Sequence, residues 1–306
     1  MIKTIIILLF TLIVVPFVTF WIDEPLFAAQ KEILWQVMYI YLGIAFACFV
    51  LGELTNNNSQ VDKIWSILPI FYAWYITVKT GMDERVVLMA ILVTLWGARL
   101  TFNFARKGAY QWKFWEGEED YRWEELRKNP ALQGKLKWTL FNFFFICFYQ
   151  NGLILLFTLP ILVAMKGIGL PLTMIDYLLA ALFLAFLLIE TIADQQMHNF
   201  QKEKKRLAKI GETKTGEYTD GFIQSGLWKK IRHPNYASEQ LIWIVFYLFS
   251  VVATGEWINW SIAGCMLLLI LFQGSSDFSE AISARKYPKY AEYQKKAGRF
   301  FPKFKL

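Results

Sequence analysis

Several residue types on which soluble enzymes often rely are scarce in this 306-residue sequence. It has two histidines, His198 and His233. It has three cysteines, and all three cysteines lie within apolar runs. Two histidines exclude a multi-histidine metal site, so a metal would need several carboxylates, and we predict none. We expect the cysteines to be free core thiols without disulfides. GxGxxG, P-loop, CxxC and HExxH motifs, internal repeats and low-complexity segments are all absent.

Long polar stretches are also few, because 56% of the residues are hydrophobic. The apolar residues form blocks near the roughly 20 residues that span a bilayer. We place these blocks at 4–20, 34–54, 63–79, 86–104, 138–165, 172–194, 238–253 and 257–274. They predict an all-α polytopic transmembrane bundle of about eight spans rather than a large soluble protein. No small-x-small cleavage site closely follows the first block, so we expect it to be retained.

Positive charge lies mostly on one side of this predicted bundle. If the N-terminus is inside, 27 of the 32 Lys and Arg residues fall in inside segments and four in outside loops. This asymmetry predicts that both termini are cytoplasmic. The net charge of +7 then faces anionic headgroups or an anionic cofactor, and nucleic acid is excluded as its reason. We expect the lipid bilayer as a partner and infer no obligate protein partner.

The three long cytoplasmic segments, at 105–137, 195–237 and 275–306, are rich in aromatic residues. Aromatic density beside balanced charge is typical of folded or interfacial segments rather than disordered ones. Loops of this length are usually functional when they are ordered. We therefore predict that the function lies on the cytoplasmic face, with a cavity that reaches into the bundle.

One face of the fourth predicted span carries an arginine stripe. Trp96, Arg99, Asn103 and Arg106 are spaced by three, four and three residues, so they share a helical face. Such a stripe suits an anionic ligand. The alternative is that the guanidinium groups extend to the lipid headgroups, which describes Arg106 well and the deeper Arg99 less well.

The sixth predicted span ends with acidic residues followed by basic ones. Glu190, Asp194 and His198 step by four residues, and Lys202 continues the same side. Carboxylates accept hydrogen bonds from ribose hydroxyls and cations hold phosphates, so this face could bind a ligand with both groups. The alternative is a polar helix end in which a buried partner neutralises Glu190.

Further polar residues converge on the cytoplasmic ends. Asp62 opens the third span, and Glu239 follows the segment GLWKKIRHPNYAS at the start of the seventh. In hydrocarbon each ionisable group needs a partner, water or a ligand, so this convergence predicts a polar cytoplasmic pocket. Gln150 and Asn151, inside the fifth span, are more simply explained by hydrogen bonds between helices. Glu280, with Tyr290 and its neighbours, forms a weaker cluster that we interpret as a lid.

Six ordered motifs resemble the steroid 5α-reductase-like membrane proteins, a superfamily that includes sterol reductases and isoprenylcysteine methyltransferases. They are VDKIWSI, TLWGARLTFNFAR, EEDYRW, IADQQMHNFQ, RHPNY and KYPKYAEYQKKAGRFFP, and they run from about residue 55 to the C-terminus. The chain looks most like the bacterial branch, which implies a bacterial inner membrane. We accordingly divide it into an N-terminal transmembrane hairpin, 1–54, and a reductase-like domain, 55–306.

The resemblance implies NADPH at the cytoplasmic ends of the C-terminal helices and hydride transfer to an activated double bond in a lipid-embedded substrate. Asp194 matches an aspartate that contacts the cofactor, Asn235 the asparagine of the PNY segment, and Glu239 the glutamate after it. Arg99 matches an arginine of the fourth-span motif. Asp62 is the nearest counterpart of the substrate-side glutamate.

Three departures from the reductases concern the reaction itself. Trp96 stands where they carry a tyrosine that is thought to polarise the enone oxygen, and an indole N–H is a far poorer proton donor. Ser238 replaces a glycine before the glutamate, and Glu280 lies near the position of a histidine. These changes argue against steroid enone reduction and leave the matched cofactor positions Asp194, Asn235 and Glu239 in place.

The leading hypothesis is therefore an NADPH-dependent membrane reductase of a lipophilic, steroid-, isoprenoid- or lipid-like substrate. Candidate proton donors are Asp62, Tyr149 and Tyr236. The predicted cofactor-binding set is Arg99, Asn103, Glu190, Asp194, Lys202, Arg232, His233, Asn235, Tyr236, Glu239, Glu280 and Tyr290. The alternative is a methyltransferase that uses S-adenosylmethionine, because its relatives share an RHPxY segment. A non-enzymatic lipid-binding protein is a third reading.

Overall fold

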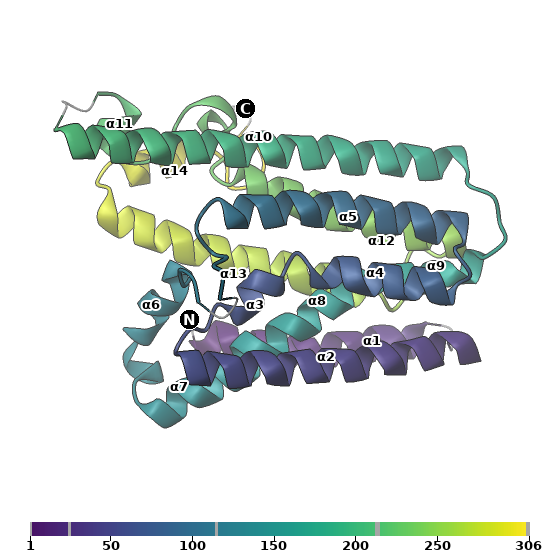
Figure 1. Ribbon diagram of the computed structural model, residues 1–306. Coiled ribbons are helices and arrows are strands. Elements are labelled where there is room, and N and C mark those ends of the chain that lie inside the picture. Colours follow the sequence, from purple (N-terminus) through teal and green to yellow (C-terminus); the bar gives the residue numbers. More distant parts are fainter. Residues whose placement is uncertain (1, 24–25, 114–115, 212–214, 304–306) are drawn as a thin grey trace. The chain divides into compact units, whose positions relative to one another are not determined.

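Residues 2–23, 26–113, 116–211 and 215–303 are described by a computed structural model (Figure 1). These residues form helices and no β-strand, with one isolated parallel bridge between Ile231 and Gly298. The helices are α1 (Ile2–Ile22), α2 (Ala28–Thr55), α3 (Gln60–Ile64), α4 (Leu68–Lys79), α5 (Glu84–Ala105), α6 (Tyr121–Arg127), α7 (Lys135–Phe141), a π-helix (Asn142–Tyr149), α8 (Gln150–Thr158), α9 (Pro160–Ala164), α10 (Met174–Ile210), α11 (Glu217–Asp220), α12 (Pro234–Thr254), α13 (Ile262–Lys286) and α14 (Tyr290–Lys296).

The predicted all-α membrane fold is confirmed. Among the described residues, six helical stretches are long and apolar enough to cross a membrane: Ala28–Thr55, Glu84–Ala105, Lys135–Gly167, Met174–Ile210, Pro234–Thr254 and Ile262–Lys286. The predicted span at 4–20 lies in α1. The predicted span at 63–79 is interrupted, because α3 ends at Ile64 and α4, with 12 residues, begins at Leu68. The orientation of the termini stays a prediction.

The chain divides into two compact units. Unit 1 comprises residues 1–180 and 244–268, and unit 2 comprises residues 181–243 and 269–306. Residues 1–54 therefore share unit 1 with the residues that follow them. Our division at residue 54 concerned sequence domains and stays a prediction.

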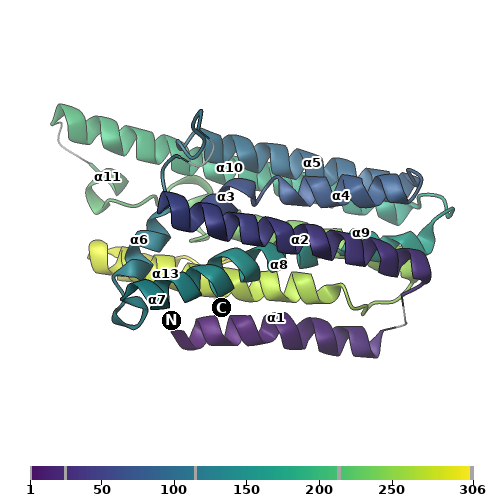
Figure 2. The same ribbon diagram turned by 60° about the horizontal axis from the view of Figure 1, so that its bottom comes forward.

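The core of unit 1 is the stretch from α7 to α9. In its most apolar segment, 89% of the residues are buried. Figure 2 shows α2 and α4 beside it, and α4 also packs against α5. The π-helix in this stretch changes the hydrogen-bond register. Two nearby carbonyls accept side-chain bonds: Phe148 O from the Tyr41 hydroxyl at 3.1 Å, and Cys147 O from Asn151 Nδ2 at 2.8 Å. These bonds satisfy polar backbone that apolar surroundings would otherwise leave unpaired.

A buried ion pair joins the starts of α5 and α10 in unit 1. Arg85 donates from Nε to Asp176 Oδ1 at 2.8 Å and from Nη2 to Oδ2 at 3.1 Å, and both side chains are almost fully buried. Asp83 caps α5 by accepting from the amide of Arg85. This pair was not predicted from the sequence, because nothing in the local pattern around Arg85 identifies a partner 91 residues away.

Unit 2 contains most of α10, the beginning of α12, the end of α13 and α14. Two aromatic clusters hold its loops. Phe200 of α10 packs with Ile223 and Trp228, while Phe222 packs with Tyr290 and Tyr293 of α14. In the segment predicted at 195–237, the described residues after α10 thus pack against α10, as the aromatic residues of this segment indicated.

Candidate functional site

The RHPNY segment of unit 2 is held by the C-terminal residues. The amides of Arg232 and His233 donate to the carbonyls of Gly298 and Arg299 at 2.8 and 3.1 Å, and Gly298 N–H donates to Lys230 O at 3.0 Å. Gly298 is required here because a Cβ at this residue would lie 1.7 Å from Phe301 O. The segment therefore enters α12 with a fixed backbone.

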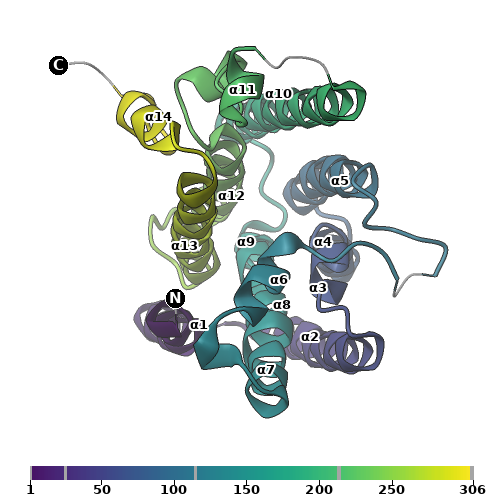
Figure 3. The same cartoon turned by 90° about the vertical axis from the view of Figure 1, so that its left-hand side faces the viewer.

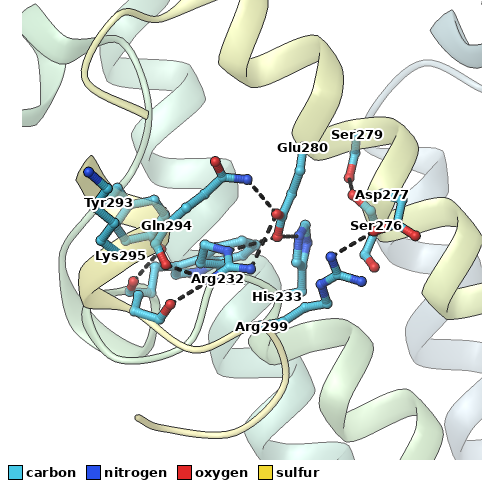
Figure 4. Close-up of polar contacts among 12 residues, drawn as sticks. Arg232, His233, Ser276, Asp277, Ser279, Glu280, Tyr293, Gln294, Lys295 and Arg299 are labelled. Carbon is cyan, nitrogen blue, oxygen red and sulfur yellow. Dashed lines mark hydrogen bonds and ion pairs between the residues drawn. The ribbon is translucent and has the colours of Figure 1, made fainter. Parts of the chain in front are cut away.

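Glu280 of α13 is the centre of the polar network in Figure 4. It accepts from Arg232 Nε at 2.8 Å, from Arg232 Nη2 at 3.2 Å and from Gln294 Nε2 at 2.7 Å. His233 Nε2 lies 2.9 Å from the same carboxylate. Arg232, His233 and Glu280 are all buried. The structure thus brings together three residues that we predicted as cofactor ligands, but it binds them to one another.

Arg232 has little capacity left for a phosphate. Besides its bonds to Glu280, its Nη1 donates to the carbonyls of Gln294 and Ala297. Nε, Nη1 and Nη2 all serve protein acceptors, so the geometry gives Arg232 a structural role in this arrangement. Its predicted contact with a cofactor phosphate stays a prediction.

The ring of His233 is held by stacking, in addition to the contact of Nε2 with Glu280. It stacks on Tyr236 with ring centroids 5.3 Å apart, and Tyr236 in turn meets Phe272 at 5.0 Å. A neutral His233 that donates from Nε2 to Glu280 presents Nδ1 as an acceptor. Tyr236, our candidate proton donor in this unit, is thus positioned through its ring.

The first turn of α12 also carries Asn235, whose amide is only half satisfied. Its Nδ2 donates to Asp194 Oδ1 of α10 at 3.1 Å. Its Oδ1 is buried and has no hydrogen-bond partner among the described residues. By helix geometry the backbone amide of Asn235 has no acceptor within α12 either. Asn235 therefore offers one acceptor and one donor to a polar ligand.

Carboxylates surround the same region of unit 2. Glu190 and Asp194 are buried on successive turns of α10, and Glu239 is buried on α12. Glu239 Oε1 accepts from Trp243 Nε1 at 2.9 Å, which orients the carboxylate. Of the predicted cations on α10, Lys202 is exposed. Lys204, its neighbour, donates to Gly221 O and to the Tyr287 hydroxyl, so it holds the following loop.

Tyr290, predicted as a cofactor contact, lies within an apolar cluster. It is 6% exposed and packs against Phe222 and Tyr293. Burial raises the pKa of both tyrosines above the usual range. The Tyr293 hydroxyl donates to Trp228 O, and Trp228 Nε1 donates to Ala193 O at 3.1 Å. Tyr290 thus contributes to packing, and its proposed contact with a cofactor stays a prediction.

The remaining predicted site residues belong to unit 1. Arg99 and Asn103 lie on α5, where Asn103 Oδ1 accepts from Arg106 Nε at 2.9 Å. Tyr149 ends the π-helix, is fully buried, stacks on Phe145 and has a hydroxyl without a hydrogen-bond partner among the described residues. That these residues share a site with those of unit 2 stays a prediction.

Asp62 is bound by residues of α6. Its Oδ2 accepts from Trp123 Nε1 at 2.8 Å, and Arg122 lies 3.7 Å from Oδ1. Burial raises the pKa of Asp62, although Arg122 opposes the rise. The segment at 105–137 was predicted to be folded or interfacial, but this pairing and the nearby ion pair of Arg127 with Glu119 were not predicted. The aromatic and charged motif EEDYRW was the available signal. Among the described residues, no group of His, Cys, Asp or Glu could hold a metal ion.

Comparison with known proteins identifies a family. Residues 48–297 match the family described as "Protein of unknown function (DUF1295)". An "Uncharacterized protein" of Schizosaccharomyces pombe is 35% identical over 274 residues, which cover 83% of this chain and 77% of the relative. No solved structure matches. The predicted superfamily is thereby confirmed, whereas the bacterial branch stays a prediction. The chain belongs to the DUF1295 family, which lies within the steroid 5α-reductase-like superfamily.

Proposed function

We propose that the protein is an integral membrane oxidoreductase that uses NADPH to reduce a double bond in a lipophilic substrate. The observation that carries the proposal is the half-satisfied amide of Asn235, which lies on the first turn of α12 beside Asp194. A buried carbonyl oxygen without a donor costs free energy, so it indicates a ligand group that donates there. The carboxamide N–H of a nicotinamide, or a ribose hydroxyl, has this property.

The residues around Asn235 fit such a cofactor in part. Carboxylates at Asp194, Glu190 and Glu239 suit ribose hydroxyls and amide donors. The backbone amide of Asn235 and the exposed Lys229 and Lys230, in the preceding segment, suit phosphates. Arg232 fits less well, because its donors already serve Glu280 and two carbonyls.

When bound, the cofactor supplies the hydride. The protein orients the cofactor, excludes water and supplies a proton. Glu280 and the C-terminal segment hold the backbone at 230–233 so that Asn235 points in one direction. Tyr236, Tyr149 and a protonated Asp62 are the candidate proton donors for the substrate atom opposite the hydride acceptor. The raised pKa of Asp62 suits a donor, whereas its bond from Trp123 suits a structural role. Substitution of each by its nearest isostere separates these roles.

One observation favours the second candidate, a methyltransferase that uses S-adenosylmethionine. That cofactor carries no phosphate, so it does not need the donors that Arg232 gives to Glu280. Its amino group and ribose suit a carboxylate-rich site. The choice therefore depends on which cofactor the protein binds.

Cofactor binding to detergent-purified protein tests the proposal. NADPH, NADH and S-adenosylmethionine are titrated against the wild type, Asn235→Ala and the control Asn199→Ala, which alters an exposed asparagine of α10. We expect NADPH to bind best and Asn235→Ala to weaken it about tenfold, the value of one lost hydrogen bond. The proposal fails if NADPH binds no better than the other two cofactors, or if both variants bind alike.

Charge reversal on α10 separates the two candidates further. Lys202 and Lys205 are exposed, so their joint replacement by Glu spares the Lys204 contacts that hold the loop. We expect NADPH binding to be lost and S-adenosylmethionine binding to be unchanged. Equal effects on both cofactors would contradict a phosphate-binding role for this face.

A further inference from the structure

An apolar groove of about 330 Å³ runs along one face of α4 in unit 1. Its lining comes entirely from this helix, from residues on three successive turns: Ile70, Phe71, Trp74, Tyr75, Val78 and Lys79. Figure 3 shows α4 between α5 and α2. Because α4 has 12 residues and is therefore about 18 Å long, it is shorter than the roughly 30 Å hydrocarbon core. The groove thus lies on a helix that is too short to cross the bilayer by itself.

The two aromatic side chains of the groove that carry a polar atom, Trp74 and Tyr75, use that atom to bond neighbouring helices. Trp74 Nε1 donates to Thr94 Oγ1 of α5 at 2.9 Å, and the Tyr75 hydroxyl donates to Gln36 Oε1 of α2 at 2.7 Å. Phe71 stacks on Tyr75 with ring centroids 6.0 Å apart. Since each ring's hydrogen-bonding group is already used by a neighbouring helix, only apolar surface remains for an occupant. A hydrocarbon chain meets that condition, whereas a polar ligand would lose its hydration without replacement.

A single cation stands at one end of this apolar surface. Lys79 is in the last turn of α4, where its Nζ lies 5.6 Å from the centre of the Tyr75 ring. The structure gives it no carboxylate partner within the described residues. The contact with Tyr75 keeps the ammonium beside the groove rather than away from it. A ligand with an apolar chain and a negative charge at one end matches both features.

We propose that this groove is a binding site for one anionic phospholipid, with an acyl chain against Phe71 and Val78 and the phosphate headgroup at Lys79. The site is separate from the residues assigned to the cofactor and does not depend on the proposed reaction. Its role is to cover the exposed apolar face of α4, where Phe71 and Val78 are 45% and 65% exposed. A zwitterionic lipid of the same chain length should bind the groove more weakly, because its ammonium group opposes Lys79.

Native mass spectrometry of the detergent-purified chain tests the headgroup contact, with phosphatidylglycerol and phosphatidylcholine of identical chains as probes. We expect the wild type to retain one phosphatidylglycerol with about five-fold preference over phosphatidylcholine. Lys79→Gln should abolish the preference and leave phosphatidylcholine binding unchanged. The control is Lys31→Gln, an exposed lysine in the first turn of α2 that does not line the groove, and it should keep the preference.

A second pair of variants tests the acyl-chain contact. Phe71→Ala should weaken both lipids about four-fold or more, since contact equivalent to at least one methylene is lost. Ile91→Ala, which shortens a similarly exposed side chain on α5, should weaken neither. Both positions are partly exposed, so the variants are expected to fold. The proposal is overturned if the wild type shows no headgroup preference, if both lysine variants lose it equally, or if the two alanine variants behave alike. Retention of detergent in place of either lipid would also overturn it.

Discussion

Replacement of Glu280 by glutamine should release the RHPNY segment from the C-terminal residues. The substitution keeps the shape of the side chain but leaves Arg232 as a buried cation without a counter-charge. Removing one partner of a buried ion pair costs about 3–5 kcal/mol. Arg232 and Glu280 are 8% and 5% exposed as side chains, which places the pair in this range. The lower limit, about 3 kcal/mol, corresponds to roughly 150-fold in a local opening equilibrium.

Amide hydrogen exchange measures this opening directly. The amides of Arg232, His233 and Gly298 donate across the bridge, so peptides that cover 228–236 and 292–300 report on it. We expect exchange there to accelerate about 100-fold or more in Glu280→Gln. The control is Glu203→Gln, which breaks an exposed ion pair with Arg206 and should change exchange less than about five-fold.

A double variant separates charge from packing. Arg232→Met with Glu280→Leu removes both charges and should recover much of the lost protection, because a buried ion pair contributes little net stability over an apolar pair. The reasoning is refuted if Glu280→Gln exchanges at the rate of the wild type, or if its effect equals that of Glu203→Gln. It is also refuted if the double variant is no better than the single one.

Three further outcomes follow from the geometry. Gly298→Ala should destabilise unit 2 in thermal unfolding, because its Cβ meets Phe301 O, whereas Gly43→Ala in α2 should stabilise by up to about 1 kcal/mol, since its Cβ meets open space. Asp176→Asn should reduce the free energy of unfolding of unit 1 by about 3 kcal/mol, which is measured as a lower unfolding temperature. Adding Arg85→Met to the same chain should restore most of that free energy. Tyr290 has a raised pKa when folded, so the unfolded chain ionises first and stability falls as pH rises above about 10. Tyr290→Phe should reduce that slope by about 1.4 kcal/mol per pH unit, measured by exchange in unit 2.

The sequence predicted the helices well because apolar blocks of bilayer length have few alternatives in lipid. Aromatic density beside balanced charge also predicted that the segments at 105–137, 195–237 and 275–306 are folded or interfacial. The sequence did not predict the π-helix at 142–149, because the composition of an apolar stretch does not distinguish the hydrogen-bond register of a π-helix from that of an α-helix. Nor did it predict that α3 and α4 are separate helices.

The site was predictable only as a set of residue types near one membrane surface. Helical periodicity relates residues three or four apart, so it grouped Glu190 with Asp194 correctly. It says nothing of pairs such as Arg232 with Glu280 or Asp62 with Trp123, which are 48 and 61 residues apart. Arg232 and Glu280 were assigned to the cofactor and Asp62 to the substrate side, although each of them has a partner in the chain. Tertiary contacts therefore decide which polar groups remain for chemistry.

The parallel bridge between residues 231 and 298 also affects the order of folding. Helices such as α10 form from neighbouring residues, but Arg232 depends on acceptors 48 and 65 residues later in the chain. Contacts of such separation form late, since the intervening residues must first be synthesised and ordered. Until then the backbone amides of Arg232 and His233 lack the carbonyls of Gly298 and Arg299 that hold them. Maturation of this part of the protein thus depends on the arrival of α14, and a chain arrested before α14 has the membrane helices without an assembled site.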